Sequence, residues 1–160
     1  SLHVVQTDPN PANFLITPEG DLALLDFGSA QRLSSEVVQA YADLVRSSLR
    51  RDYRSVEKAG VRLGFLSDND SIAARKAFLK VIDIISETYA GPEYCWKDCK
   101  IAKRVHDETI RFTTSTHFRP PPSGVVFLNR RILGNQLIME KLGSRIRFRE
   151  LVQEYLDLPN

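Results

Sequence analysis

The chain has 160 residues, of which 42% are apolar and 26% are charged, a composition typical of one globular domain with a hydrophobic core. Its formal net charge of +2 is too small to argue for a nucleic-acid partner, so none is expected. No apolar run approaches the roughly 20 residues needed to cross a bilayer, and there is no signal-peptide pattern, although Ser1 is not a natural start.

The opening of the chain reads as a loop followed by a tight hairpin. Prolines, asparagines and an aspartate between positions 6 and 13 predict the loop. Phe14–Thr17 and Leu22–Leu25 predict two short strands, and the Pro-Glu-Gly-Asp sequence at 18–21 predicts the turn between them. The second strand runs into an Asp-Phe-Gly sequence at 26–28, so the hairpin returns the chain towards the loop that it left.

After the hairpin, apolar residues recur at helical spacing. Ser34 or Ser35 is the expected N-cap of the first helix, Asp52 that of the second, and Gly64 closes the second helix. A rigid break at Pro120-Pro121-Pro122 precedes the last two helices. The sequence therefore predicts an α+β, mostly helical fold with five or six helices, the plan of a protein-kinase-like large lobe. The expected helices cover roughly positions 37–49, 53–63, 70–89, 99–112, 125–142 and 148–156.

The two cysteines, Cys95 and Cys99, are four positions apart, the spacing of successive helical turns. This spacing is a poor frame for a disulfide bond, and no second Cys or His pair accompanies it at zinc spacing. We therefore expect reduced thiols on a half-buried helix, with a metal or redox role as the alternative. Reduced thiols are typical of a reducing, intracellular compartment.

The loop and hairpin gather three oxygen-bearing side chains around one point. Asp8 and Asn13 lie five positions apart in the loop, and Asp26 follows thirteen positions later at the strand end. Phosphoryl transfer needs a carboxylate near the attacking hydroxyl and oxygen ligands that hold Mg²⁺ against the phosphates of ATP. This spacing is the D-x-x-x-x-N…D-F-G part of the kinase signature. We expect Asp8 to be a catalytic base or positioning group, and Asn13 and Asp26 to be nucleotide-binding Mg²⁺ ligands. A structural turn is the alternative for each residue.

The residues around this motif resemble the UbiB/AarF-domain (ADCK) family of atypical kinases. The resemblance rests on Val5-Gln6-Thr7-Asp8-Pro9-Asn10-Pro11-Ala12-Asn13-Phe14-Leu15 and on Leu24-Leu25-Asp26-Phe27-Gly28. It continues in Phe118-Arg119-Pro120-Pro121-Pro122 and in Val126-Phe127-Leu128-Asn129-Arg130-Arg131-Ile132-Leu133-Gly134.

This resemblance implies that residues 1–160 are the C-terminal lobe of an atypical kinase-like domain. Residues 1–33 would hold the catalytic loop, the hairpin and the Asp-Phe-Gly sequence, and residues 34–160 the helical region. It also implies that Asp26 and Asn13 bind Mg²⁺ and that Asp8 is the catalytic-loop aspartate.

The chain departs from the kinase pattern in two respects. Gln6 and Thr7 stand where ordinary kinases have His and Arg, which removes the arginine that reads an activation-loop phosphate. All seven lysines lie after position 57, so none can be the strand lysine that precedes the catalytic loop. A glycine-rich lid and the family's Lys-x-Gly-Gln signature are absent as well. We therefore expect a fragment without its N-lobe, inactive on its own.

By resemblance, the parent protein is an ATPase or a small-molecule or lipid phosphotransferase linked to isoprenoid-quinone (ubiquinone) metabolism. Two alternatives stay open: an aminoglycoside- or choline-kinase-like phosphotransferase, and a non-catalytic remnant acting as a lipid- or protein-binding helical module. The expected partners are a nucleotide and a membrane surface or prenyl-lipid. A peptide substrate is not expected, because only Ser29–Leu33 separate Gly28 from the first helix. The expected location is intracellular, cytoplasmic or peripheral to a membrane, mitochondrial or plastid if eukaryotic.

Other ionisable residues carry weaker signals. The histidines lie far apart in the sequence and are expected to be structural or at the surface. The clustered arginines predict solvated helix ends, with contact to anionic lipid headgroups as the alternative. One of Arg130 and Arg131, near Gly134, is expected to be a buried structural arginine, and the sequence does not choose between them. These histidines and clustered arginines are His3, His106, His117, Arg46, Arg50, Arg51, Arg54, Arg145, Arg147 and Arg149.

Overall fold

The computed structural model describes residues 3–115 and 121–156. A small β-rich region precedes a body of α-helices, so the fold is mostly helical, as the sequence predicts. His117, Phe118, Arg119 and Pro120 lie outside the described residues. The α-helices are α1 (Ser35–Leu49), α2 (Tyr53–Arg62), α3 (Ile72–Ala90), α4 (Ile101–Ser115), α5 (Ser123–Leu142) and α6 (Phe148–Leu156).

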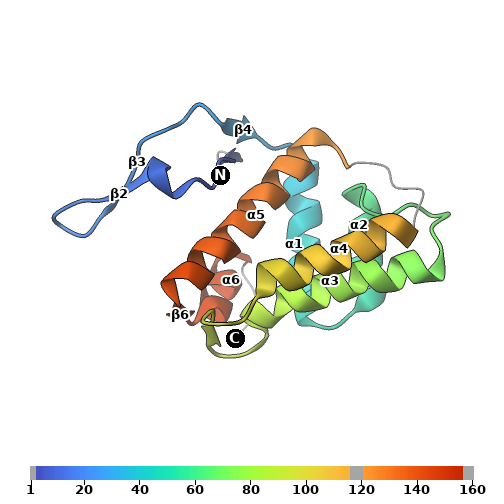
Figure 1. Ribbon diagram of the computed structural model, residues 1–160. Helices are drawn as coiled ribbons and strands as arrows, with labels where there is room; N and C mark the ends of the chain where they lie inside the picture. The colour runs from blue at the N-terminus through green and yellow to red at the C-terminus, as the bar shows by residue number, and fades with distance from the viewer. Residues whose placement is uncertain (1–2, 116–120, 157–160) are drawn as a thin grey trace.

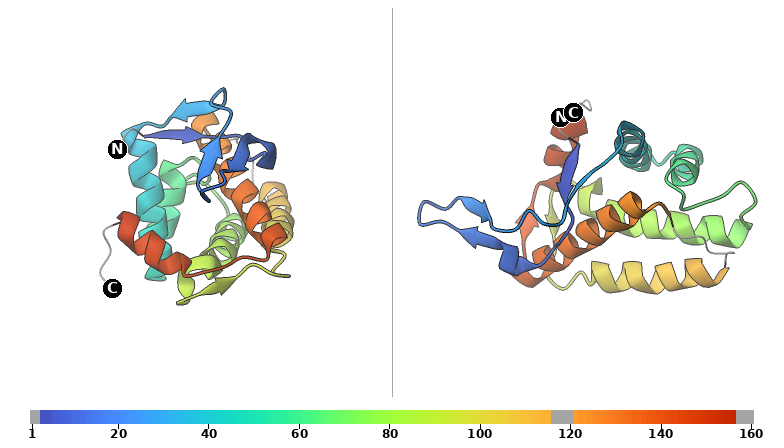
Figure 2. Two further views of the ribbon diagram at one scale, coloured as in Figure 1. Left: turned by 90° about the vertical axis from the view of Figure 1, so that its left-hand side faces the viewer. Right: turned by 90° about the horizontal axis from the view of Figure 1, so that it is seen from above.

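The strands of the described residues are short and form three antiparallel pairs, β1–β4, β2–β3 and β5–β6. Figure 1 and the right-hand view of Figure 2 show the β2–β3 hairpin projecting away from the helical body. The strands are β1 (Val4–Gln6), β2 (Phe14–Ile16), β3 (Leu22–Leu24), β4 (Ala30–Arg32), β5 (Tyr94–Cys95) and β6 (Arg145–Ile146), and a 3-10 turn, η1, covers Pro11–Asn13.

The helix boundaries follow local signals in the sequence. The Ser34 hydroxyl accepts a hydrogen bond from the Val37 amide at 3.2 Å, which caps α1. The Asp52 carboxylate accepts one from the Ser55 amide at 3.1 Å, which caps α2. Both caps satisfy backbone N–H groups that have no partner inside the helix. Pro122 is the N-cap residue of α5, at the break predicted from the prolines.

Two hydrophobic clusters hold the helical body together. The larger one is built mainly from α1, α2 and α3, with Phe112 of α4 and Val125 of α5 completing it. The smaller one surrounds Trp96, which is 1% exposed, and receives side chains from α3, α4, α5 and α6. The Trp96 indole N–H donates to Gln136 Oε1 of α5 at 2.6 Å, so α5 is fixed to the smaller cluster by a buried hydrogen bond. None of the helices in the described ranges is long and apolar enough to span a bilayer.

The prediction that Cys95 and Cys99 share a helix is wrong. Cys95 belongs to β5, which pairs with β6, and Cys99 lies in the turn before α4 begins at Ile101. The helix begins late because the buried Trp96 occupies the intervening turn, where its backbone N–H donates to the Ser144 carbonyl at 2.8 Å. Both thiols are free and half-buried.

Candidate active site

The loop that carries Asp8 is tied at its base to the segment that follows the hairpin. Both the backbone N–H and the hydroxyl of Thr7 donate to the Ser29 carbonyl, at 3.1 and 2.7 Å. Thr7 is 4% exposed, and it is the only buried residue between positions 3 and 39. The register of β1 and β4 continues this contact, with Gln6 opposite Ala30. The two ends of the loop-hairpin segment are therefore held side by side.

Asp8 and Asn13 are brought into direct contact. The Asn13 side-chain N–H donates to Asp8 Oδ2 at 2.7 Å, and the backbone N–H of Asn10 donates to Asp8 Oδ1 at 3.3 Å. The contact depends on η1, which is capped by the Asn10 side chain accepting from the Ala12 amide and has Pro11 at its first position. A proline is favourable there because its missing N–H would have no helical partner. This turn reverses the chain, so that residue 13 faces residue 8.

Asp26 lies beside Asn13 along the backbone. The Leu25 N–H donates to the Asn13 carbonyl at 2.9 Å, which extends the β2–β3 pairing to the residue before Asp26. The Asp26 carboxylate is exposed and accepts a hydrogen bond from the Gly28 N–H at 2.7 Å. The structure thus joins Asp8 to Asn13 through their side chains, and it joins Asp26 to Asn13 through the backbone of the hairpin.

The oxygen atoms left over in this arrangement are of the chemical type that a hard cation prefers. Because the Asn13 N–H is directed at Asp8, its carbonyl oxygen is the atom that remains for a ligand. Together with the Asp26 carboxylate it offers the type of oxygen donor that Mg²⁺ prefers. Within residues 3–115 and 121–156, no group of three or more His, Cys, Asp or Glu side chains is placed to hold a metal ion. Two protein oxygens suit Mg²⁺ that takes its other ligands from phosphate and water.

Two neighbouring arginines of α5 approach Asp8 in different ways. Arg131 Nη1 donates to the backbone carbonyl of Asp8 at 3.1 Å, and its guanidinium carbon lies 5.0 Å from the centroid of the Phe14 ring. Arg130 Nη2 lies 3.8 Å from Asp8 Oδ1, and the Arg130 side chain is 64% exposed. The sequence predicted a structural arginine at position 130 or 131, and these contacts identify it as Arg131.

Burial lowers the pKa of the Arg131 guanidinium, and the negative charge of Asp8 opposes that shift. Because the pKa of an arginine lies far above neutrality, the group stays charged at neutral pH. Its hydrogen bond to the Asp8 carbonyl is therefore charge-assisted, which makes it stronger than a bond between two neutral groups.

The close approach of α5 to the loop depends on Gly134. A β-carbon at this position would overlap the ring of Pro9, and Gly134 is itself buried. The sequence suggested no role for Gly134, because a glycine within a helix gives no local sign of what packs against it. Only the pairing of α5 with the loop explains the glycine.

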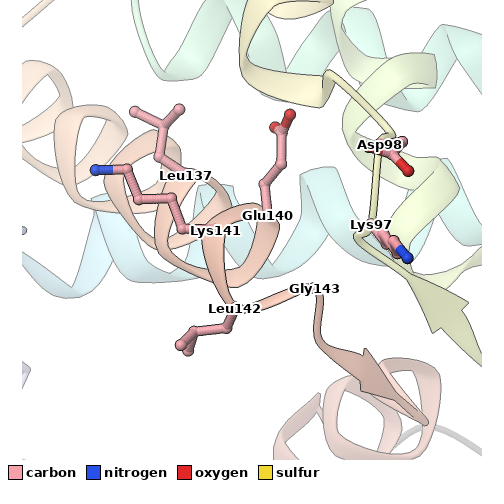
Figure 3. A pocket seen from close by; sticks show the side chains of 7 residues that line it. All are labelled: Lys97, Asp98, Leu137, Glu140, Lys141, Leu142 and Gly143. Carbon is pink, nitrogen blue, oxygen red and sulfur yellow. The ribbon is translucent and has the colours of Figure 1, made fainter.

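Two open hollows lie along α5. A groove of about 350 Å³ opens beside Asp8, between the loop and the helix, and Arg130 and Lys141 contribute to its lining. A second hollow of about 670 Å³ shares Leu137 and Lys141 with this groove but holds none of the predicted site residues. Figure 3 shows the Glu140 side chain of this second hollow extending towards the turn that carries Asp98.

The other ionisable residues singled out in the sequence lie apart from this loop. His106 is exposed, and His3 Nδ1 lies 3.5 Å from the Ser35 hydroxyl at the surface. Two of the clustered arginines bind the ends of other elements: Arg46 donates to the Leu156 carbonyl at 3.2 Å, and Arg149 donates to the Ala90 carbonyl at 2.8 Å.

Comparison with known proteins gives matches over most of the chain. Residues 1–60 match the ABC1 atypical kinase-like domain. The chain is 31% identical over 153 residues to the mitochondrial atypical kinase COQ8 of Schizosaccharomyces pombe, a match that covers 93% of this chain and 25% of that protein. It is 28% identical over 151 residues to the probable serine/threonine-protein kinase abkA of Dictyostelium discoideum, covering 89% of this chain and 26% of that protein. The mitochondrial atypical kinase COQ8 of Saccharomyces cerevisiae is 26% identical over 154 residues, a match that covers 94% of this chain and 30% of that protein. The chain thus spans 25% to 30% of the length of these relatives.

Proposed function

This chain is related to the ABC1, or UbiB/AarF, atypical kinases, and on that premise we propose that it carries the catalytic loop and the metal-binding residues of a Mg²⁺- and ATP-dependent site. The observation that carries the proposal is the 2.7 Å hydrogen bond between the side chains of Asp8 and Asn13. Asp26 directly follows Leu25, whose N–H donates to the Asn13 carbonyl. These three residues are the ones that the kinase signature requires.

Each of the three residues has a distinct role in this proposal. Asn13 offers its carbonyl oxygen and Asp26 its carboxylate to Mg²⁺, which when bound neutralises charge on the phosphates. Asp8 orients the acceptor hydroxyl or water and accepts its proton. The Asn13 N–H holds Asp8 Oδ2, which fixes the carboxylate in one orientation before the acceptor arrives.

The short segment after the hairpin favours a small or lipid acceptor over a peptide. β4 takes up Ala30–Arg32 by pairing with β1, and the cap of α1 follows at Ser34. Protein kinases need a long segment at this place, closed by an Ala-Pro-Glu-like anchor, on which the peptide lies. The name of the Dictyostelium relative says protein kinase, so peptide acceptors belong in the test.

The proposed context is isoprenoid-quinone metabolism at a membrane surface in a mitochondrion or plastid. It is supported by relatives named atypical kinase COQ8, mitochondrial, and by two relatives from Arabidopsis thaliana, 36% and 40% identical over 81 and 60 residues, whose names say chloroplastic. ATP hydrolysis alone and transfer to a lipid acceptor both remain within the proposal, because Asp8 can position a water molecule or a hydroxyl.

The test measures turnover of labelled ATP by the full-length protein that contains this chain, with Mg²⁺ or with EDTA. We expect Mg²⁺-dependent turnover, and we expect Asp26→Ala to weaken Mg²⁺-dependent nucleotide binding by about 100-fold or more, because a direct metal ligand is lost. Asp21→Ala removes another exposed carboxylate of the hairpin and serves as the matched control. Equal binding by the Asp26→Ala and Asp21→Ala variants would contradict the proposed metal site.

The acceptor is tested in the same assay with a peptide array and, separately, with anionic vesicles that contain quinone precursors. Labelling of the vesicle lipid, or stimulated hydrolysis, is expected. Labelling of peptides that depends on Asp8 would contradict the proposed acceptor class.

A further inference from the structure

The catalytic loop has no cation of its own beside Asp8. Thr7 precedes Asp8, and its hydroxyl is bound to the Ser29 carbonyl. In ordinary kinases an arginine stands at this position. A charged group nevertheless reaches the Asp8 backbone, and it comes from a residue 123 positions later in the chain, Arg131 of α5.

Arg131 contacts both ends of the segment that carries Asp8 and Asn13. Its Nη1 donates to the carbonyl of Asp8, the first residue of the segment, at 3.1 Å. Its guanidinium also lies over the ring of Phe14, the residue directly after Asn13, at 5.0 Å from the centroid. Because the guanidinium is planar and rigid, these two contacts fix the distance between the ends of the segment.

The contact to Asp8 is made through the backbone and leaves the carboxylate unoccupied by Arg131. The two carboxylate oxygens of Asp8 accept instead from Asn13 and from the Asn10 amide. Arg131 therefore sets the orientation of the peptide unit at Asp8 without competing for the atoms that would meet an acceptor.

The next turn of α5 makes the third contact with the loop. Gly134 lies three positions after Arg131 on the same helical face and packs against Pro9. One face of α5 thus meets the loop at residues 8, 9 and 14.

We infer that Arg131 is a positioning residue that holds the catalytic loop from α5. It acts through Asp8 and Asn13 and does not touch the reacting groups. The inference rests on the proposed function, because it gives Asp8 and Asn13 their roles in catalysis.

Arg130 provides a matched variant on the same helix. It is the same residue type, next in sequence, and it also approaches Asp8, but through a 3.8 Å ion pair made by a side chain that is 64% exposed. Exposed ion pairs are weak and are screened by salt. A comparison of Arg131→Gln with Arg130→Gln therefore separates the fixed contact from a general effect of positive charge near Asp8.

The first arm of the test is amide hydrogen exchange on this chain. We expect Arg131→Gln to speed exchange at the Asn13 and Leu25 amides by about 10-fold or more relative to Arg130→Gln. The Asn13 amide donates to the Asn10 carbonyl and the Leu25 amide to the Asn13 carbonyl, and both acceptors lie in the segment that Arg131 contacts. Exchange at Ile82, in the larger core cluster, should not change. Arg131→Lys should restore part of the protection, since lysine keeps a charged donor but cannot cover Phe14 as a planar group.

The second arm is kinetic and uses the full-length protein with Mg-ATP. We expect Arg131→Gln to lower kcat by about 10- to 100-fold, because a small displacement of positioned groups has effects of this size. The KM for ATP should change less than kcat, and Arg131→Lys should recover part of the rate. Arg130→Gln should have a smaller effect that fades at high salt.

Two results would overturn the inference. One is equal exchange at Asn13 and Leu25 in the two glutamine variants. The other is faster exchange at Ile82 that matches the change in the loop, which would show a merely structural role. Absence of Mg²⁺-dependent turnover in the unaltered protein would overturn the proposed function instead, and the exchange comparison alone would then decide whether Arg131 positions the loop.

Discussion

The loop-hairpin region, residues 3–33, and the helical body that follows are stabilised in different ways. The body contains two hydrophobic clusters, whereas Thr7 is the only buried residue between positions 3 and 39. Large apolar side chains of the hairpin are exposed, among them Ile16 at 77% and Leu22 at 69%. The region that holds the candidate site therefore has no core of its own. Its shape comes from backbone pairing and from contacts with α5, so stability and function should respond to different substitutions.

Substitutions in the two regions test this comparison, and the largest effect, a loss of ATP turnover, is expected at Asp8. In the full-length protein, Asp8→Ala should lower ATP turnover by about 10²- to 10⁴-fold, the range typical of lost general acid–base catalysis. Nucleotide binding should fall far less than in Asp26→Ala, because Asp8 is not a proposed metal ligand. The free energy of unfolding should change by about 1 kcal/mol or less, since the partners of Asp8 can turn to water. If Asp8→Ala and Asp26→Ala lost nucleotide affinity equally while both stayed folded, the different roles proposed for Asp8 and Asp26 would be contradicted.

The next effect concerns stability and is expected in the body. Leu63 is fully buried, so Leu63→Ala should reduce the free energy of unfolding by about 2–5 kcal/mol. Leu22→Ala makes the same chemical change in the hairpin, where the side chain is 69% exposed, and should cost less than about 0.5 kcal/mol. Urea denaturation of the 160-residue chain measures both. Similar losses for the two leucines would mean that the hairpin is packed in solution.

A smaller effect is expected where the two regions meet. Gly134→Ala would place a β-carbon against Pro9, and we expect a loss of about 1–3 kcal/mol from the overlap or a displaced loop. At Gly124, also in α5, an added β-carbon would meet only a Leu33 methyl group at an ordinary 3.7 Å, and Gly124→Ala should stay within about 1 kcal/mol. Calorimetric melting compares the two variants. Tolerance of alanine at position 134 would show that α5 does not need to lie this close to the loop.

Local features of the structure could be predicted from the sequence. The caps at Ser34 and Asp52 and the β2–β3 hairpin depend on residues a few positions apart, and the structure has them where the sequence indicates. The approach of Asp8 to Asn13 is of the same kind, because only five positions separate them. Their roles in binding and catalysis remain predictions.

Features that depend on distant pairing could not be predicted. The strand β4 is three residues long, and only its pairing with β1 makes it a strand. The cysteines were assigned to a helix from their spacing alone, yet β5 pairs with β6, about fifty positions away. To choose between Arg130 and Arg131, one must know how α5 is rotated relative to the loop. The periodicity of apolar residues within α5 does not give this rotation.

The separation of 123 positions between Asp8 and Arg131 also has a consequence for biosynthesis. A ribosome adds about 5–20 residues per second, so roughly 6–25 s pass between the synthesis of the loop and that of the arginine that braces it. During this interval the loop and the apolar hairpin side chains leave the ribosome without α5. A nascent chain that stops before α5 can form its first helices, but it lacks the helix that orders the loop. The contacts that Arg131 and Gly134 make with the loop can therefore form only on chains whose translation has continued through α5.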